Sequence, residues 1–432
     1  MRIDPPFRNT LVAVVAAAAC LVAALSLGSC ADSEAAVIRL ATSRPEFAGY
    51  AELFNQEQPE YKVELVYAAE PQELLSQPGP PDIVVSERLT SRDAFARLDA
   101  LDILFRGGAL RRDSFYPGSL QLGTYEGRQR AIAISFNLPA VVFRSSHAQE
   151  LGAGFVEDVA DLKATAAGFN AVSGDRITRM GFSPLWDRSF LVTTAVFGPP
   201  SFDGGADGRM TWRSAELLSA VRLLRDWVGR VNGSMAAQQE FTDRYLYGPY
   251  TELLRQGRIE FYQVSSRELF GLSPSRLDGL DYRWLSIGER IPVLADVVSV
   301  GIPRGARHKG AARAFLRWFL SAESQEAILA DSTSGQTRGE GFGIAGGFST
   351  LPEVNERSLA RFYPILLGHI LTPDLLRFPQ ALPTDWKEIR DTLVLPWLVD
   401  VVKRTREPDE GLAQELTLFL RDGVEELRRD RD

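Results

Sequence analysis

Hydrophobic and polar residues alternate near the start of the main body of the chain in the way that α/β proteins require. Short apolar runs predict strands at 37–41, 62–67 and 82–85, and the third run is typical of a buried parallel strand. Apolar residues at helical spacing predict helices at 46–58 and 91–98. Strands and helices that alternate in this way indicate a doubly wound α/β domain.

The alternation of strands and helices continues to the end of the chain. The clearest helix is predicted at 213–230, where Leu217, Leu224 and Val228 fall on one apolar face. A segment rich in glycine and serine predicts a loop at 332–347. We further predict strands at 128–134, 140–143, 259–264 and 296–301, and helices at 248–256, 309–320, 324–330 and from 386 onward.

The N-terminus carries a different pattern. Arg2 and Arg8 precede an uncharged apolar run at 11–27, which fits a signal peptide and also fits a membrane anchor. The run ends in Leu27-Gly28-Ser29-Cys30, which resembles a bacterial lipobox. The alternative is an ordinary signal-anchor helix that ends in a cysteine.

The lipobox resemblance implies a lipoprotein. Residues 1–29 would be the signal peptide, Cys30 would carry the lipid, and 30–36 would be a short tether. Acyl chains gain about 0.8 kcal/mol per buried CH₂, so two or three of them hold a folded domain at a bilayer. We therefore expect a body in the cell envelope, anchored by lipid to a membrane and exposed on its extracytoplasmic side.

The composition excludes several classes of protein. The 432 residues include two cysteines, Cys20 and Cys30, so the body has neither a disulfide scaffold nor a cysteine nucleophile. The three histidines, His147, His308 and His369, are far apart and do not suggest a metal site. The net charge of -8 argues against a nucleic-acid partner. The length favours two or three domains.

Motifs for catalysis or cofactor binding are weak. The segment 341–346 matches GxGxxG, but it follows a predicted loop rather than a strand and opens no predicted helix. We interpret it as a crossover loop. The sequence contains neither a GxxxxGK[ST] phosphate loop nor a GxSxG elbow. We therefore expect a protein that is not an enzyme and that uses no cofactor and no metal.

The order of several short motifs resembles family 1 extracellular solute-binding proteins, the binding subunits of ABC importers that are related to maltose-binding protein. Each motif is weak alone, but together they follow the family order over nearly the whole body. The matching pieces are Pro81-Asp82-Ile83-Val84, the segments 113–117, 125–134, 202–215 and 254–259, Ser299-Val300-Gly301-Ile302-Pro303 with 311–325, and Leu351-Pro352.

This resemblance implies a periplasmic-binding-protein-like fold of type II, in which two α/β lobes are joined by a hinge and hold a ligand in the cleft between them. We place the crossings between the lobes near Ile134, Asp296 and Gly346. Lobe 1 would then comprise 37–133 and 297–345, and lobe 2 would comprise 134–296 and 346–432.

Candidate ligand contacts follow from two rules. Clefts of this kind form at the carboxyl ends of strands, and aromatic rings near a cleft can stack on the flat face of a sugar. The candidates are Arg44, Glu46, Ser86, Glu87, Phe136, Asn137, Trp186, Tyr247, Ser265 and Trp284. Arg44 and Glu87 could equally form a solvated ion pair.

The resemblance also implies a function. A monomer would capture a small solute, with a carbohydrate as the leading class, and would deliver it to the permease of an ABC importer. Phe143-Arg144 stands where the family commonly has Tyr-Asn, and the helix before the third strand is shortened to about 71–77. These departures keep open an alternative: a sensor or protein-interaction lipoprotein whose ligand site has diverged or been lost.

The lipid anchor gives the first testable prediction. Changing Cys30 to alanine removes the only sulfur at the end of the apolar run, so we expect the variant to lose lipid labelling and to leave the membrane fraction. Metabolic labelling with a fatty acid, followed by fractionation, measures both effects. Cys20→Ala is the matched control and should behave as the parent chain does. A Cys30→Ala variant that stays lipidated would show that the anchor is assigned wrongly.

Overall fold

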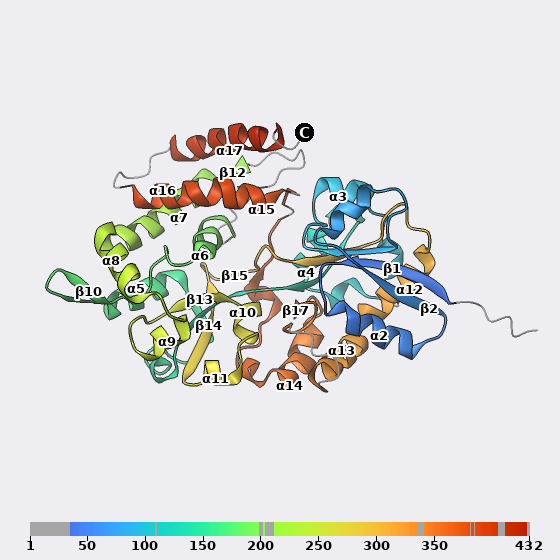
Figure 1. Ribbon diagram of the computed structural model, residues 1–432, viewed down its shortest axis with the longest axis horizontal. Coiled ribbons are helices and arrows are strands. Elements are labelled where there is room, and N and C mark those ends of the chain that lie inside the picture. Colours follow the sequence, from blue (N-terminus) through green and yellow to red (C-terminus); the bar gives the residue numbers. More distant parts are fainter. Residues whose placement is uncertain are drawn as a thin grey trace, which may run out of the picture.

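The chain folds around two β-sheets that lie side by side in separate lobes (Figure 1). The structure is a computed structural model that describes residues 35–108, 110–197, 202–203, 211–334, 341–380, 382–383, 385–404 and 411–429. Cys30 and the predicted signal peptide lie outside these residues. Within the described part of the chain, no helix is both long and apolar enough to cross a membrane.

The first lobe is built on a six-stranded sheet with the order β17-β6-β16-β3-β1-β2. Strands β1, β2 and β3 are parallel, whereas β16 runs antiparallel to both β3 and β6. The apolar runs predicted near the N-terminus therefore form neighbouring strands. The strands are β1 (Ala36–Thr42), β2 (Tyr61–Tyr67), β3 (Ile83–Ser86), β6 (Ile132–Phe136), β16 (Val298–Gly301) and β17 (Phe348–Ser349).

Amphipathic helices cover this sheet. On α2 and α12 the apolar faces meet through aromatic rings, and the Phe54 and Phe315 ring centroids lie 5.2 Å apart. Burial of such side chains is the main favourable term in folding. The helices of the first lobe are α2 (Phe47–Glu57), α3 (Arg92–Arg97), α4 (Pro117–Leu122), α12 (Lys309–Phe319) and α13 (Ala322–Ser334), and a short hairpin joins β4 (Thr124–Tyr125) to β5 (Arg128–Gln129).

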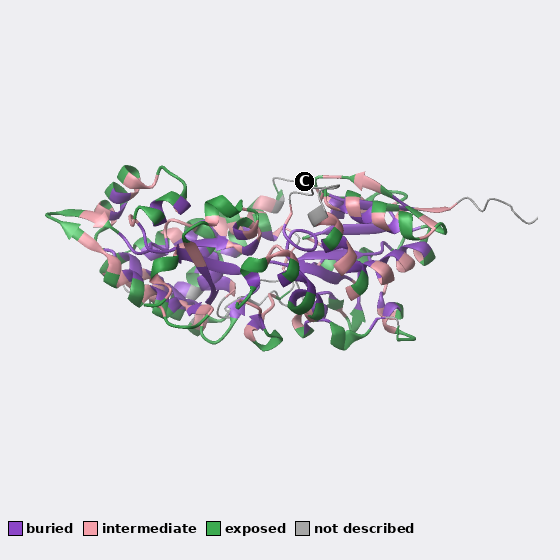
Figure 2. Ribbon diagram, turned by 90° about the horizontal axis from the view of Figure 1, so that it is seen from below, coloured by how far each residue is buried: buried purple, intermediate pink, exposed green. Residues whose placement is uncertain are grey.

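The second lobe has a four-stranded sheet with the order β13-β7-β14-β8. Figure 2 shows buried strands at the centre of each lobe and exposed helices around them. The strands are β7 (Pro139–Arg144), β8 (Val156–Asp158), β13 (Tyr262–Ser265) and β14 (Leu280–Ser286). The helices around them are α5 (Val159–Phe169), α6 (Arg188–Val192), α7 (Ser214–Asp226), α8 (Met235–Tyr245), α9 (Tyr250–Arg255), α10 (Ser266–Phe270) and α11 (Pro274–Leu277).

Three more helices close the chain over the second lobe, where Figure 1 shows them as the upper red layer. They are α15 (Trp386–Ile389), α16 (Leu395–Lys403) and α17 (Gly411–Arg429), and both α16 and α17 pack on α7. The apolar residues of α16, including Trp397 and Leu398, join the core beneath them. The helical tail predicted from 386 onward is therefore confirmed for the described residues.

Stretches of chain pass between the lobes in three places among the described residues. Asn137 and Leu138 connect β6 to β7, the segment 287–297 connects β14 to β16, and the chain leaves the first lobe again after β17. Two of these passages are tied by β15 (Ile291–Pro292), which pairs in parallel with β18 (Leu376–Arg377). Since β6 extends to Phe136 and pairs with β17, the sheet reaches beyond Ile134. The lobe boundaries given above stay a prediction.

Most predicted strands and helices are found within a few residues of their expected positions. The clearest miss is β14, the strand that pairs with both β7 and β8 in the second sheet. Its sequence hides the strand because Asp281 and Arg283 interrupt the apolar pattern. Arg283 nevertheless lies inside the lobe, where its guanidinium donates to Glu157 and to the Leu151 carbonyl oxygen, each at 2.8 Å.

The buried pair Arg283–Glu157 gives a prediction about stability. Both side chains are only 6% exposed. Burial raises the pKa of Glu157 while Arg283 lowers it. Arg283→Met would leave the Glu157 carboxylate buried without its counterion, which costs about 3–5 kcal/mol of unfolding free energy. Urea denaturation measures this loss.

Two further variants make the result interpretable. Arg290→Met removes an exposed arginine from the turn after β14 and should leave the urea midpoint almost unchanged. Combining Arg283→Met with Glu157→Leu should recover much of the loss, because an apolar pair of similar volume needs no counterion. Equal midpoints for Arg283→Met and Arg290→Met would contradict a structural role for the pair.

Candidate functional site

A cavity of about 620 Å³ is lined by residues of both lobes. On the side of the first lobe, its lining comes from the loops that follow the parallel strands β1, β2 and β3. Ligands of open α/β sheets bind outside the carboxyl ends of such strands. The first-lobe lining consists of Ser43, Ala69, Glu70, Pro71, Ser86, Glu87, Arg88, Thr90 and Ser91.

The opposite wall combines three segments: α6 with the helical turn after it, the crossing segment before β16, and the region around α15. This wall is partly apolar and partly charged, so it offers both packing and polar contacts. Its residues are Arg188, Ser189, Val192, Thr193, Phe197, Leu294, Ala295, Asp296, Leu382, Pro383, Trp386, Lys387, Arg390, Asp391 and Leu395.

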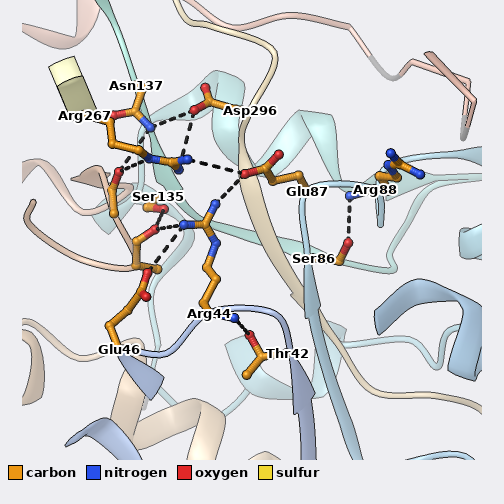
Figure 3. A network of polar contacts seen from close by, with 12 residues as sticks. Thr42, Arg44, Glu46, Ser86, Glu87, Arg88, Ser135, Asn137, Arg267 and Asp296 are labelled. Atoms are coloured by element: carbon orange, nitrogen blue, oxygen red, sulfur yellow. Dashed lines mark hydrogen bonds and ion pairs between the residues drawn. The ribbon is translucent and has the colours of Figure 1, made fainter. Parts of the chain in front are cut away.

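A network of charged side chains connects the lobes next to this cavity (Figure 3). Arg44, in the loop after β1, forms ion pairs with Glu87 and, at 3.4 Å, with Glu46. Its Nη1 also donates to the carbonyl oxygen of Ala345 at 3.0 Å. The Arg44 side chain is only 12% exposed, so the loops after β1 and β3 are held together around a largely buried guanidinium.

Arg267 extends the network into the second lobe. It lies on α10, and its Nε donates to the carbonyl oxygen of Gly346 at 3.0 Å. Its two Nη atoms lie 3.8 Å from a Glu87 oxygen and 3.5 Å from an Asp296 oxygen. One guanidinium therefore contacts the loop after β3, the loop before β17 and one of the passages between the lobes.

Asn137 holds the passages together at their centre. It is completely buried. Its side-chain nitrogen donates to Asp296 at 3.0 Å and to the Gly346 carbonyl oxygen at 3.2 Å. Its side-chain oxygen accepts a hydrogen bond of 2.8 Å from the Ser266 hydroxyl group of α10. This amide thus joins two of the passages, through Asn137 itself and Asp296, to α10 and to the loop before β17, and these contacts define the hinge region of the molecule.

Gly346 explains the glycine-rich motif. Its φ of +76° belongs to the left-handed region that favours glycine. A Cβ atom at this position would lie 2.9 Å from Nη1 of Arg44 and 3.3 Å from Nε of Arg267. The last glycine of the GxGxxG match therefore serves a tight turn and a close approach of two arginines.

Opposing effects act on Glu87. Burial raises the pKa of Glu87, and the nearby Asp296 carboxylate adds to the rise, while Arg44 and Arg267 lower it. The net direction is upward, although the side chain keeps 40% of its surface exposed. Desolvation together with Asp296 thus outweighs both guanidinium groups, which offset only part of the cost of a charged Glu87 carboxylate.

The structure brings several of the predicted contact residues together, but mostly in the hinge network. Arg44, Glu46, Glu87 and Asn137 form it, and only Glu87 among them also lines the cavity. The hydroxyl groups of two predicted serines already form hydrogen bonds within their own lobes. The Ser86 hydroxyl group lines the cavity and donates to Gln72, and Ser265 caps the N-terminus of α10.

The predicted aromatic contacts are corrected by burial. Trp284 is completely buried, and its indole nitrogen donates to the His369 carbonyl oxygen, so a ligand cannot reach it. Phe136 is 1% exposed and belongs to the core in the same way. Tyr247 is 86% exposed, and Trp186 packs on the ring of Phe182; both lie outside the cavity lining.

Residues that were not predicted from the sequence line the cavity and complete the charged network. Phe197 and Trp386 provide the aromatic part of the lining, and Arg267 and Asp296 complete the network. Arg267 could have been found by the same rule as Ser265, because it lies two residues beyond the end of β13. Nothing in the sequence indicated that Trp386 of α15 lines the cavity.

Two α/β lobes, three passages between them and a cavity bounded by both define the class of two-lobed binding proteins. The model of the bacterial extracellular solute-binding protein family matches residues 49–336, which is more than half of the chain. The chain belongs to this family, whose members bind solutes outside the cytoplasm and are not enzymes. No curated protein sequence matches the chain.

Solved structures share the fold at low sequence identity. The sugar-binding protein MalE from Xanthomonas citri has a TM-score of 0.66 and 14% identity, over 91% of this chain and 99% of its own. A sugar transporter from Rhizobium etli in an open conformation has a TM-score of 0.66 and 15% identity, over 90% and 99%. A solute-binding protein from Staphylococcus aureus in complex with maltose has a TM-score of 0.61 and 13% identity, over 90% and 98%.

The hinge network gives a prediction about motion. Arg267→Met removes two ion pairs and a hydrogen bond to Gly346, and we expect a loss of about 1 kcal/mol because partly exposed ion pairs are weak. This loss corresponds to about fivefold faster hydrogen exchange at the amides of Leu294, which lies in a passage, and Gly347, which lies in the loop before β17. Exchange measured by mass spectrometry tests it.

Arg276→Met provides the control for this experiment. Arg276 is an exposed arginine of α11, in the same lobe, and forms no ion pair among the described residues. Its substitution should leave exchange in the passages unchanged. Equal exchange in the two variants would mean that Arg267 does not restrain the hinge.

Proposed function

We propose that this chain is the solute-binding component of an ABC importer, that Cys30 anchors it to a membrane, and that it captures a carbohydrate between its lobes. The observation that carries the proposal is the cavity bounded by both lobes. Its volume of about 620 Å³ falls within the range of about 300–1,000 Å³ that is typical of small-molecule sites.

Capture requires the lobes to move about the passages. The network around Asn137 lies where two of the passages meet the loop before β17, so rotation there changes the width of the cavity without unfolding either sheet. A bound solute that contacts both walls favours the closed arrangement through its additional contacts. The closed shape is then the signal that a permease can distinguish from the empty protein.

A carbohydrate suits the lining. Hydroxyl and charged groups alternate with the rings of Phe197 and Trp386, and sugars present both hydroxyl groups and flat apolar faces. The names of similar structures point the same way: they include complexes with maltose, with maltotriose and with mannotriose. These proteins share the fold, and their ligands support the proposal for this chain by analogy.

The proposal predicts ligand-dependent stability. We expect the full-length chain, purified in mild detergent, to unfold at a higher temperature in the presence of its oligosaccharide. A ligand at 100 times its dissociation constant contributes about 2.7 kcal/mol, which a thermal-shift measurement detects easily. The panel should contain neutral and acidic oligosaccharides of two to four units. A panel without any shift would argue against the proposed function.

A cavity-filling variant shows where the ligand binds. Ala69 is exposed and lines the cavity, so Ala69→Trp should occupy the space of the ligand and weaken binding at least tenfold. Ala48 is an exposed alanine on α2 outside the lining, and Ala48→Trp should bind as the parent does. If Ala69→Trp retains full affinity in calorimetry, the ligand binds elsewhere.

A further inference from the structure

The charges that line the cavity are unevenly paired. All four acidic residues of the lining have a basic partner. Glu70 pairs with Arg88 at 3.1 Å and Asp391 pairs with Arg390 at 2.7 Å. Glu87 and Asp296 pair with the arginines of the hinge network, as described above. The acidic side chains therefore have no unpaired charge to offer a ligand.

Two basic side chains of the lining behave differently. Arg188, on α6, and Lys387, on α15, are both exposed and both line the cavity. Neither has an ion pair or a side-chain hydrogen bond with any described residue. Both belong to the wall of the second lobe. The cavity thus contains two unpaired positive charges, although the chain as a whole carries a net charge of -8.

Closure of the lobes changes the energetic cost of these two charges. While the cavity is open, water solvates Arg188 and Lys387 at little cost. When the lobes close on a ligand, water is displaced, and a buried charge without a partner is strongly unfavourable. A neutral ligand leaves this cost uncompensated, whereas an anionic group pairs with the cations and forms charge-assisted hydrogen bonds with them. Closure therefore selects for a negatively charged solute.

We propose that the solute is an acidic carbohydrate whose carboxylate groups pair with Arg188 and Lys387. This inference rests on the proposed function and narrows it to one class of ligand. A uronate oligosaccharide has the required chemistry, because each unit combines hydroxyl groups, an apolar ring face and a carboxylate. The rings of Phe197 and Trp386 and the hydroxyl groups of the lining would contact the uncharged parts of such a ligand.

The test compares ligands that differ in charge but not in shape. Trigalacturonate is titrated into the full-length chain in mild detergent, in parallel with its methyl ester and with maltotriose. We expect the acid to bind at least tenfold more tightly than the ester, because each charge-assisted hydrogen bond is worth about tenfold or more in affinity. Its affinity should also fall as the salt concentration rises.

Substitutions identify the cations. Arg188→Gln and Lys387→Gln should each weaken trigalacturonate binding about tenfold and strengthen binding of the ester, because closure on the ester then buries one unpaired charge fewer. The matched controls are Arg307→Gln and Lys403→Gln, which remove exposed charges of the same kind outside the cavity lining. Thermal unfolding of each variant without ligand shows that it is folded.

Each outcome of the test is decisive. Preference for the acid, lost in the two cavity variants and kept in the controls, supports the inference. Equal or tighter binding of the ester or of maltotriose overturns it and leaves the proposed function intact. Preference for the acid that survives in both cavity variants overturns the assignment to Arg188 and Lys387. Failure of all three ligands, together with a panel that shows no shift, overturns both the inference and the proposed function.

Discussion

The architecture depends on one buried amide. Asn137 joins two of the passages between the lobes to the loop before β17 through hydrogen bonds to Asp296 and Gly346, and it accepts another from α10. Because the amide is shielded from water, each of these bonds would leave an unsatisfied buried group if it were broken. The passages are therefore fixed to one another, and relative motion of the lobes has to occur around this point rather than through it. The pairing of Glu87 with Arg44 and Arg267 is opposed by the burial of the Glu87 carboxylate, which raises its pKa.

The two walls of the cavity differ in structure and in charge. The first-lobe wall consists of loops at the ends of parallel strands, whose acidic residues are already paired with arginines. The second-lobe wall is contributed largely by short helices, including α15 from the C-terminal region, and these carry the unpaired cations. Both lobes determine the shape of the cavity, whereas its unpaired positive charges come from the second lobe.

Strand-end reasoning from the sequence found the loops after β1 and β3 and selected Asn137 as a candidate, because short apolar runs mark the strands clearly. It failed for the aromatic residues. Trp284 lies on β14, whose pattern is masked by the buried Arg283, so its place in the core could not be read from hydrophobicity. Likewise, the position of Trp386 depends on how α15 packs against distant parts of the chain. Local pattern therefore predicted which strand ends line the cavity, but not which side chains reach it from far away in the sequence.

The strand order of the first sheet has a consequence for how the protein is made. Strand β16 lies between β6 and β3 and bonds to both, although the whole sheet of the second lobe precedes it in the sequence. Without β16, β3 and β6 each have an edge that it would otherwise pair with, and no strand joins them in the sheet. Such non-local pairing slows folding. The first lobe can therefore be completed only after the strands of the second lobe have been synthesised.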